Sequence, residues 1–173
     1  PSCRMGGRAR KTNGAGSFKL RIDASDIGTG ADTMFCQVAA EALGVSVEKI
    51  IPYSSDTDMT PFDPGAYASS TTYISGRAVE KAARLVLEQI KEVAGRMLEE
   101  NPLDLHTHEE KVCAKDGRFV TYAQVCLSSL YQQDQFQIMA TASHMSYDSP
   151  PPFAAVFAEV EVDTETGLVR GLT

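Results

Sequence analysis

The residues best placed to do chemistry lie in a loop that precedes the longest helical pattern of the chain. Residues 57–73 read TDMTPFDPGAYASSTTY, with carboxylates, two prolines and a glycine ahead of a run of hydroxyls. The prolines and the glycine interrupt any helix or central strand, and the hydroxyls of residues 69–72 fall where the free N–H groups of a helix start gather. Because such groups bind anions, the loop predicts a cradle for an anion or a cofactor. The alternative is that the hydroxyls only cap the helix.

A second, shorter loop reads DIGTG at residues 26–30 and lies between a predicted strand and a predicted helix. Its backbone N–H groups can converge on an anion, and its two glycines permit close approach. The alternative is an ordinary strand-to-helix turn with a Thr cap. A dinucleotide-binding fingerprint requires a third glycine where this chain has Thr33, so we reject that interpretation.

Two clusters of potential metal ligands are better explained as solvated loops. Asp56 and Asp58 form a D-x-D pair with Asp63 beyond a proline, but Pro61 stands where a calcium loop requires glycine. Residues 106–110 read HTHEE and follow a helix-ending Asn-Pro, without the H-E-x-x-H spacing of a zinc protease. We therefore predict no metal site, and no nucleophile constellation stands out.

Composition limits the class of protein. The chain has 173 residues, enough for one domain with a real core, and a net charge of -7, which argues against nucleic-acid partners. Its four cysteines contain no C-x-x-C pair, and we expect free thiols, three of them in the core, in a reducing cytoplasm. No apolar run is long enough for a membrane span, and the start lacks a signal-peptide pattern, so we expect a soluble protein.

Basic residues are concentrated at the start of the chain. Six of the sixteen Lys and Arg residues precede the first acidic residue, Asp23. We predict that residues 1–15 form a basic, flexible arm and that residues 16–173 form the folded domain.

Hydrophobic periodicity divides the first half of that domain into strands and helices. Alternation over residues 18–24 predicts a half-buried strand, and apolar residues at i, i+3 and i+4 predict a helix over 31–43. Thr29 and Asp32 fit a capping box for this helix, and Gly44 suits its C′ position. A short strand is predicted at 50–53, and a second helix from residues 69–72 to about Leu98.

The second half contains shorter elements. An Asp-Gly turn at residues 116–117 predicts a hairpin, and Thr121 with Gln124 predicts a second capping box, opening a helix through Leu130. Residues 135–142 are expected to be extended, and alternation over 156–162 followed by a turn predicts two final strands. This order of elements indicates an α+β fold with a mixed sheet and packed helices.

Two motifs at a suitable separation carry a family resemblance. DIGTGADT at residues 26–33 and DTDMTPFDPGA at 56–66 resemble the molybdenum-binding subunit of xanthine dehydrogenases and related molybdenum hydroxylases. The resemblance extends from about Gly16 to Ala94, and more loosely through Pro150-Pro151-Pro152-Phe153 to Gly167. It implies a molybdopterin-binding-domain-like fold, and because the family's subunit is several times longer, we expect this chain to be one piece of it.

The resemblance also implies site residues. In the family, the first loop contacts the pterin at Gly28 and at the position of Thr29, where Gln is common, so the shorter Thr29 weakens that side-chain contact. The second loop holds the pterin and its phosphate through Ala68, Ser69 and Thr71. The family's general base is a Glu that follows a glycine; this chain contains no Gly-Glu pair, so we predict no catalytic residue in it.

The implied activity is that of an oxidoreductase. By resemblance, the whole enzyme hydroxylates a purine-type heterocycle with a molybdenum-pterin cofactor, and passes electrons to iron–sulfur clusters and FAD on other domains or subunits. Its expected partners are the rest of the molybdenum subunit, those redox subunits and a small heterocyclic substrate. The alternatives are an aldehyde or nicotinate-type hydroxylase, a non-redox module that binds a phosphorylated small molecule, and a fragment with a purely structural role.

Overall fold

The main sheet of the domain is mixed. We describe a computed structural model over residues 2–9, 16–131, 135–148, 150–151 and 154–171. Four strands follow the order β3-β2-β1-β7. Strands β1 (Ser2–Ala9) and β2 (Gly16–Ile22) are antiparallel, as are β1 and β7 (Met139–Ser143), whereas β2 and β3 (Ile50–Ser54) are parallel. The predicted mixed sheet is therefore confirmed.

The parallel pair is joined by helix α1 (Ala31–Leu43), which forms a βαβ unit with β2 and β3. The alternating pattern of β2 buries Phe18, Leu20 and Ile22 and leaves Lys19 exposed, as its sequence predicts. Gly44 ends α1 in the left-handed conformation, with φ of 66°, which confirms the predicted C′ position. A short 3₁₀ turn, η1 (Val47–Lys49), leads into β3.

The predicted flexible arm is a strand over most of its length. Residues 2–9 form β1, in the interior of the sheet, and Cys3 and Met5 are fully buried there. The prediction was wrong for these residues because a pair of glycines interrupts the local alternation, while pairing on both edges stabilises the strand through residues distant in sequence. Residues 10–15 lie outside the described residues.

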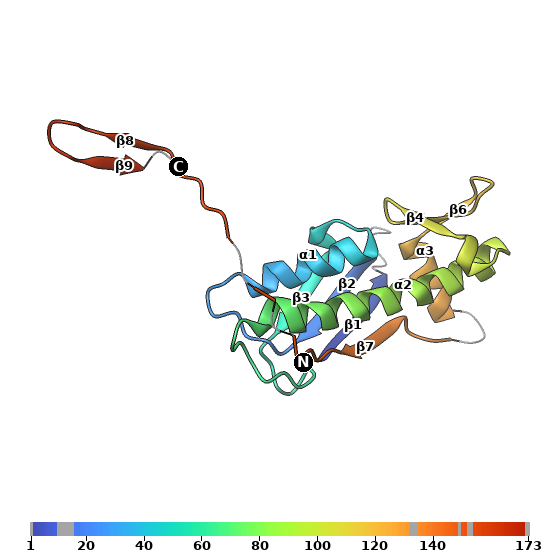
Figure 1. Ribbon diagram of the computed structural model, residues 1–173. Coiled ribbons are helices and arrows are strands. Elements are labelled where there is room, and N and C mark those ends of the chain that lie inside the picture. Colours follow the sequence, from blue (N-terminus) through green and yellow to red (C-terminus); the bar gives the residue numbers. More distant parts are fainter. Residues whose placement is uncertain (1, 10–15, 132–134, 149, 152–153, 172–173) are drawn as a thin grey trace.

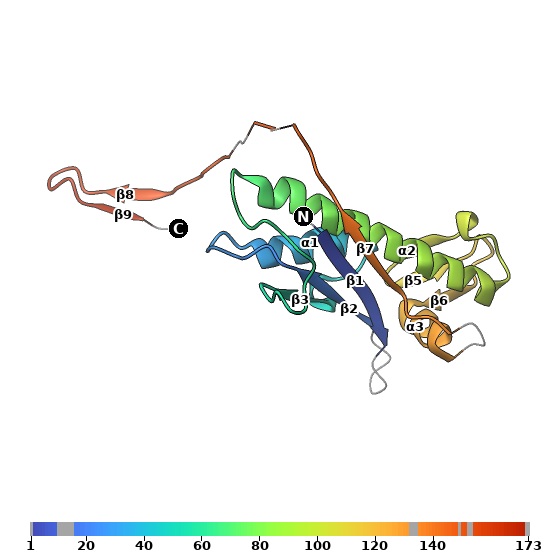
Figure 2. The same ribbon diagram turned by 90° about the horizontal axis from the view of Figure 1, so that it is seen from below.

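The second helix is the longest element and covers the sheet together with α1. A π-helical turn, η2 (Thr71–Ser75), continues into α2 (Gly76–Leu98). Its buried face includes Val79, Val86 and Ile90, which are fully buried, and each such side chain contributes about 1.5–3 kcal/mol relative to exposure. Figures 1 and 2 show α1 and α2 side by side on one face of the sheet. This arrangement brings the starts of the two helices to the same end of the domain (Figure 1).

A small second sheet adjoins the end of α2. After η3 (Pro102–Asp104), strands β4 (His106–His108), β5 (Lys111–Cys113) and β6 (Phe119–Thr121) form an antiparallel meander, which confirms the hairpin. Helix α3 (Tyr122–Tyr131) follows. The capping box is present as predicted: the Gln124 side chain accepts a hydrogen bond from the N–H of Thr121 at 2.8 Å, and the Gln124 N–H donates to the Thr121 hydroxyl at 3.2 Å.

Tyr122 ties α3 to the main core. Its hydroxyl donates a hydrogen bond of 2.8 Å to the carbonyl of Leu43, and its ring packs edge-on against Phe18. Burial raises the pKa of Tyr122 to about 12. Three of the four cysteines, Cys3, Cys36 and Cys126, are buried free thiols, as expected.

The last described strands form a separate hairpin. β8 (Val160–Val162) pairs with β9 (Val169–Gly171) around the predicted turn, but the strand begins at Val160, not at Val156. Figures 1 and 2 show this hairpin extended away from the rest of the domain. Among the residues that the structure describes, no helix has the length and apolar character needed to span a membrane.

A candidate cofactor cradle between two helix starts

The two predicted loops meet at one cavity. A cavity of about 390 Å³ is lined by residues of the first loop, Ile27 and Thr29, and by residues of the second: Ala66, Tyr67, Ala68, Ser69, Thr71 and Thr72. Four of the five predicted site residues therefore line one space, and the fifth, Gly28, lies between two of the lining residues in sequence. None of the lining side chains is charged.

The first loop is organised by a carboxylate that we did not single out. Asp26 Oδ1 accepts hydrogen bonds from the backbone N–H groups of Gly28, Thr29 and Gly30 at 2.8, 2.9 and 3.2 Å. The N–H groups thus converge on an anion, as the pattern suggests, but the anion belongs to the chain itself. Gly28 and Gly30 have φ of 93° and 74°, and this left-handed conformation lets the backbone curl around the carboxylate.

The capping box predicted for α1 is absent from this described loop. Gly30, not Thr29, is the N-cap residue, and no side chain makes a capping hydrogen bond there. Asp32 lies in the first turn, where its Oδ2 accepts a hydrogen bond from the Ser54 hydroxyl at 3.1 Å, while its Oδ1 is buried without a partner in the described part of the chain. The physical reason is that the Asp26 carboxylate already accepts from the N–H groups that precede the helix.

The second loop is anchored by Asp63, which we expected to be a solvated carboxylate. Asp63 is only 7% exposed, accepts from the N–H of Gly65 at 2.9 Å, and accepts from the buried Ser75 hydroxyl at 3.1 Å. The expectation was wrong because the loop brings Asp63 against Ser75 at the start of α2, where the carboxylate is buried. Asp63 therefore fixes the loop to the helix whose start it precedes.

The backbone is strained where the second loop meets the helix. Ala68 and Ser69 are consecutive non-glycine residues with φ of 46° and 58°. Such conformations cost of order 1–3 kcal/mol each and persist only where the surrounding structure fixes them, commonly at functional sites. The π-helical turn that follows, over residues 71–75, is also a feature often found at functional sites.

The hydroxyls of this stretch do not cap the helix. Neither the N-cap of η2, Ser70, nor that of α2, Ser75, makes a side-chain capping hydrogen bond. Ser69 and Thr72 are exposed, and within the described part of the chain their hydroxyls have no hydrogen-bond partner. The capping alternative is therefore wrong at both N-caps, and the Ser69 and Thr72 hydroxyls remain available to a ligand in the cavity.

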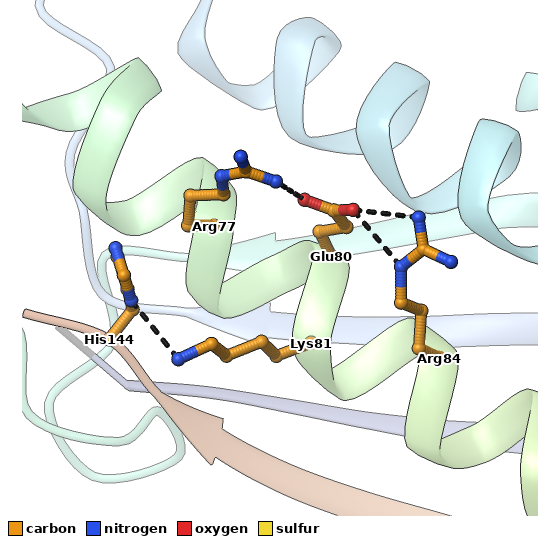
Figure 3. A network of polar contacts seen from close by, with 5 residues as sticks. All are labelled: Arg77, Glu80, Lys81, Arg84 and His144. Atoms are coloured by element: carbon orange, nitrogen blue, oxygen red, sulfur yellow. Dashed lines mark hydrogen bonds and ion pairs between the residues drawn. The ribbon is translucent and has the colours of Figure 1, made fainter.

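A second cavity adjoins the first and brings a cation to the site. It measures about 560 Å³, shares Ala68, Ser69 and Thr72 with the first, and is further lined by Arg77, Glu80 and a short list of mainly apolar residues: Val38, Tyr73, Gly76, Pro150 and Pro151. Figure 3 shows the polar network around it. Arg77 donates to one oxygen of Glu80, and Arg84 donates to the other from Nε and Nη2 at 3.0 and 2.9 Å.

Charges along α2 keep this network ionised. Hydrogen bonds from Arg77 and Arg84 lower the pKa of Glu80, and the hydrogen bond to Glu80 raises the pKa of Arg77. On the next face of the helix, Lys81 Nζ lies 3.1 Å from His144 Nδ1 (Figure 3), and desolvation together with the Lys81 and Arg77 charges lowers the pKa of His144. One carboxylate thus faces two guanidinium groups, and with Lys81 this stretch of α2 carries more positive than negative charge.

The other candidate clusters contribute nothing to the cavity. His106 and His108 lie in strand β4, not in a loop, and Glu110 pairs with Lys49. Asp56 accepts a hydrogen bond of 2.8 Å from the Tyr53 hydroxyl. Across the described ranges, no group of three or more His, Cys, Asp or Glu side chains is arranged to hold a metal ion.

Sequence reasoning missed Asp26, Ile27, Tyr67 and Arg77 as parts of the site. Asp26 carried a usable signal, because an Asp two residues before a glycine is typical of a side chain that accepts hydrogen bonds from nearby backbone N–H groups. Arg77 lies five residues after Thr72, so the predicted helix places it between one and two turns beyond the hydroxyl stretch.

The fold and this paired-loop site define a molybdopterin cofactor-binding domain. The model of that family matches residues 8–173, and the chain belongs to the family. It is 33% identical over 156 residues to the putative xanthine dehydrogenase molybdenum-binding subunit XdhA of Escherichia coli K12, covering 87% of this chain and 21% of that protein. It is 34% identical over 160 residues to the probable hypoxanthine oxidase XdhD of the same strain, covering 92% and 17%.

Solved structures share the fold. The reconstituted CO dehydrogenase from Oligotropha carboxidovorans superimposes with a TM-score of 0.76 and 24% identity, covering 99% of this chain and 21% of that one. Quinoline 2-oxidoreductase from Pseudomonas putida 86 gives a TM-score of 0.70 and 22% identity, covering 98% and 22%. The chain thus spans about a fifth of the length of the proteins it matches.

The residues around the first cavity fit part of a pterin cofactor. The volume of about 390 Å³ lies in the range of small-molecule sites, and small side chains at Ala66 and Ala68 let a flat ring approach the backbone. The Ser69 and Thr72 hydroxyls, which have no partner among the described residues, match the polar edges of a pterin, and Arg77 in the adjacent cavity can neutralise a phosphate. No carboxylate lines the first cavity to repel an anion.

Proposed function

We propose that this domain holds the organic part of a molybdenum-pterin cofactor between Thr29 and the stretch that contains Ala68, Ser69 and Thr71. The observation that carries the proposal is the single cavity lined by both loops. The strained backbone at Ala68 and Ser69 supports it, because that conformation directs the loop along the cavity wall. Gly28 remains part of the proposed site through its carbonyl group, since its N–H is engaged by Asp26.

The role of the chain in this proposal is positioning. Ser69 and Thr71 donate hydrogen bonds to polar groups of the cofactor, Ala68 permits close approach, and Arg77 offers a positive charge nearby. The cofactor, when bound, supplies the two-electron redox chemistry, and the protein contributes orientation and electrostatics. We assign no general base to this chain, in keeping with the absence of a Gly-Glu pair from its sequence.

For the intact protein we propose a purine-type hydroxylase of the cytoplasm that passes electrons to iron–sulfur and FAD domains or subunits. Support comes from the relatives' names, since the proteins named for xanthine and hypoxanthine are 33% and 34% identical. The CO dehydrogenase large chains of Hydrogenophaga pseudoflava and Afipia carboxidovorans are 31% and 27% identical. A second candidate substrate class is a nicotine-derived heterocycle or an aldehyde, because a 6-hydroxypseudooxynicotine dehydrogenase subunit of Paenarthrobacter nicotinovorans is 30% identical.

The cradle is tested by comparing Ser69→Ala with Asp58→Ala in the intact protein. Losing a hydrogen bond to a charged group costs about 1.5–3 kcal/mol, which weakens cofactor binding by roughly tenfold or more, whereas an exposed loop carboxylate contributes within about 0.5 kcal/mol. We expect lower molybdenum content per purified protein in Ser69→Ala, measured by elemental analysis at matched thermal stability. Equal loading in the two variants would place the cradle elsewhere.

The substrate class is tested separately. We expect the intact protein to reduce an artificial electron acceptor with hypoxanthine or xanthine at a higher kcat/KM than with nicotinate, benzaldehyde or CO. A preference for one of the last three would exclude the purine assignment and leave the cradle untouched.

A further inference from the structure

The first loop carries its own anion. A single oxygen of Asp26 receives three backbone N–H donors within 3.2 Å, from Gly28, Thr29 and Gly30. These are the donors that a loop at a helix start would otherwise turn toward a phosphate. Asp26 is exposed, so the carboxylate occupies a position that solvent anions could also reach.

The start of α1 holds a second carboxylate as well. Asp32 lies in the first turn, with one oxygen on the Ser54 hydroxyl and the other buried and unpaired within the described residues. A helix start carries the equivalent of about half a positive charge. Two carboxylates more than neutralise it, so a further anion at α1 would be repelled.

The charged groups near the start of the second helix differ from those at α1. Neither η2 nor α2 has an acidic residue in its first turn, and Arg77 lies at the adjoining cavity. Two carboxylates lie nearby, and each is bound by other groups: Glu80 accepts hydrogen bonds from two guanidinium groups, and the buried Asp63 accepts from the Ser75 hydroxyl and the Gly65 N–H. The anionic portion of any ligand in the cavity is therefore attracted to the α2 side.

We propose that Asp26 is a positioning residue: its carboxylate is the resident anion of the Gly28–Gly30 turn, closes that turn to a ligand phosphate, and holds Thr29 at the cavity wall. Thr29 then faces an uncharged portion of the ligand, and the phosphate lies on the side of Ser69 and Arg77. The identity of the ligand in this inference rests on the proposed function. The occupancy of the turn by the Asp26 carboxylate is independent of that function.

The lowered pKa of Asp26 agrees with this role. Desolvation is the largest single influence and raises its pKa, but the N–H groups of Gly28, Gly30, Asp32 and Thr29 together outweigh it, and the pKa of Asp26 is lowered. A lowered pKa means that the turn binds the negative form in preference to the neutral one.

The test is a titration of backbone N–H signals by nuclear magnetic resonance, with sodium phosphate and sodium formate as probes at constant ionic strength. In the natural protein, the signals of Gly28, Thr29 and Gly30 should not respond to either anion. In Asp26→Ala, the same signals should shift saturably. The thermal midpoint of this variant should fall by about 2–4 °C, and formate should restore part of that loss. Asp26→Asn, which keeps an uncharged acceptor, should show a smaller loss and a weaker response.

Asp163, in the turn between β8 and β9, provides a matched control. Asp163 accepts from the N–H groups of Glu165 and Thr166 at 2.9 and 3.3 Å, in a similar turn. Asp163→Ala should leave the signals of Gly28 to Gly30 insensitive to both anions. In the intact protein, molybdenum content should fall several-fold in Asp26→Ala and remain unchanged in Asp163→Ala.

The outcomes separate this inference from the proposed function. A saturable response of Gly28 to Gly30 in the natural protein, or none in Asp26→Ala, would overturn the assignment of Asp26 and leave the cradle standing. Anion rescue of Asp26→Ala in a protein that never acquires molybdenum would uphold Asp26 as the resident anion and overturn the proposed cofactor.

Discussion

The two helix starts that face the cavity differ in how they satisfy their free N–H groups. The loop before α1 turns three N–H groups onto Asp26 and places Asp32 in the first turn of the helix. Helix α2 and the turn before it have no acidic residue in the first turn, and the loop presents the hydroxyls of Ser69 and Thr72, which have no hydrogen-bond partner in the described part of the chain. One start is closed by the chain itself, and the other is open to a ligand.

The difference shows that a helix start is not by itself an anion site. Whether a helix start can bind an anion depends on the nearby carboxylates. Asp26 accepts hydrogen bonds from the N–H groups just before α1, whereas Asp63 accepts from Gly65 and Ser75. Asp63 accepts hydrogen bonds from the Gly65 N–H and the Ser75 hydroxyl, and so stabilises the second loop without lining the cavity itself. Asp26 thus occupies the N–H groups of the first loop, whereas Asp63 stabilises the second loop.

The largest effect on stability is expected at Asp63. Asp63→Ala leaves the buried Ser75 hydroxyl and the Gly65 N–H without an acceptor, which should lower the free energy of unfolding by about 2–4 kcal/mol. Guanidinium denaturation measures this change, with the exposed Asp58→Ala as the control, expected within about 0.5 kcal/mol. Equal stability of the two variants would mean that the second loop is held by other contacts.

A smaller effect of opposite sign is expected at Ala68. Its φ of 46° is costly for a residue with a Cβ, so Ala68→Gly should raise the free energy of unfolding by about 0.5–1 kcal/mol after the entropic cost of glycine. Ala66→Gly, in the same loop at negative φ, should lower it by a similar amount. Two changes of the same sign would remove the case for strain at the open helix start.

The smallest effect concerns the pH dependence at the closed helix start. Because hydrogen bonding lowers the folded pKa of Asp26, the stability it provides is present above the unfolded pKa of about 3.9 and is lost as the pH falls through the folded pKa. The difference in thermal midpoint between the natural protein and Asp26→Asn should be constant above about pH 5 and shrink below it. A difference that persists unchanged at lower pH would show that the charge of Asp26 is not what holds the turn.

The sequence predicted the elements whose stabilising contacts are local. The Thr121 and Gln124 capping box, the Gly44 helix end, and the alternation of β2 all depend on residues a few positions apart, and all are confirmed. Strand β1 depends on two partners distant in sequence, so its own composition misled the prediction.

The candidate site was predicted in its location more fully than in its chemistry. The resemblance implied that both loops contact one pterin, and residues of both loops line one cavity, because a βαβ unit and a neighbouring helix place both helix starts at one end of the sheet. The occupation of the first turn by Asp26 depends on backbone dihedral angles at Gly28 and Gly30, which the residue types permit but do not specify.

The most direct test of the account is hydrogen–deuterium exchange on the intact protein, with and without its cofactor, read at both helix starts. We predict that cofactor binding slows exchange at Ser69, Thr71 and Thr72, which line the cavity, and leaves residues 28–30 unchanged, because Asp26 accepts hydrogen bonds from their N–H groups in both states. Slower exchange at residues 28–30 alone, or no change at residues 69–72, would contradict the account.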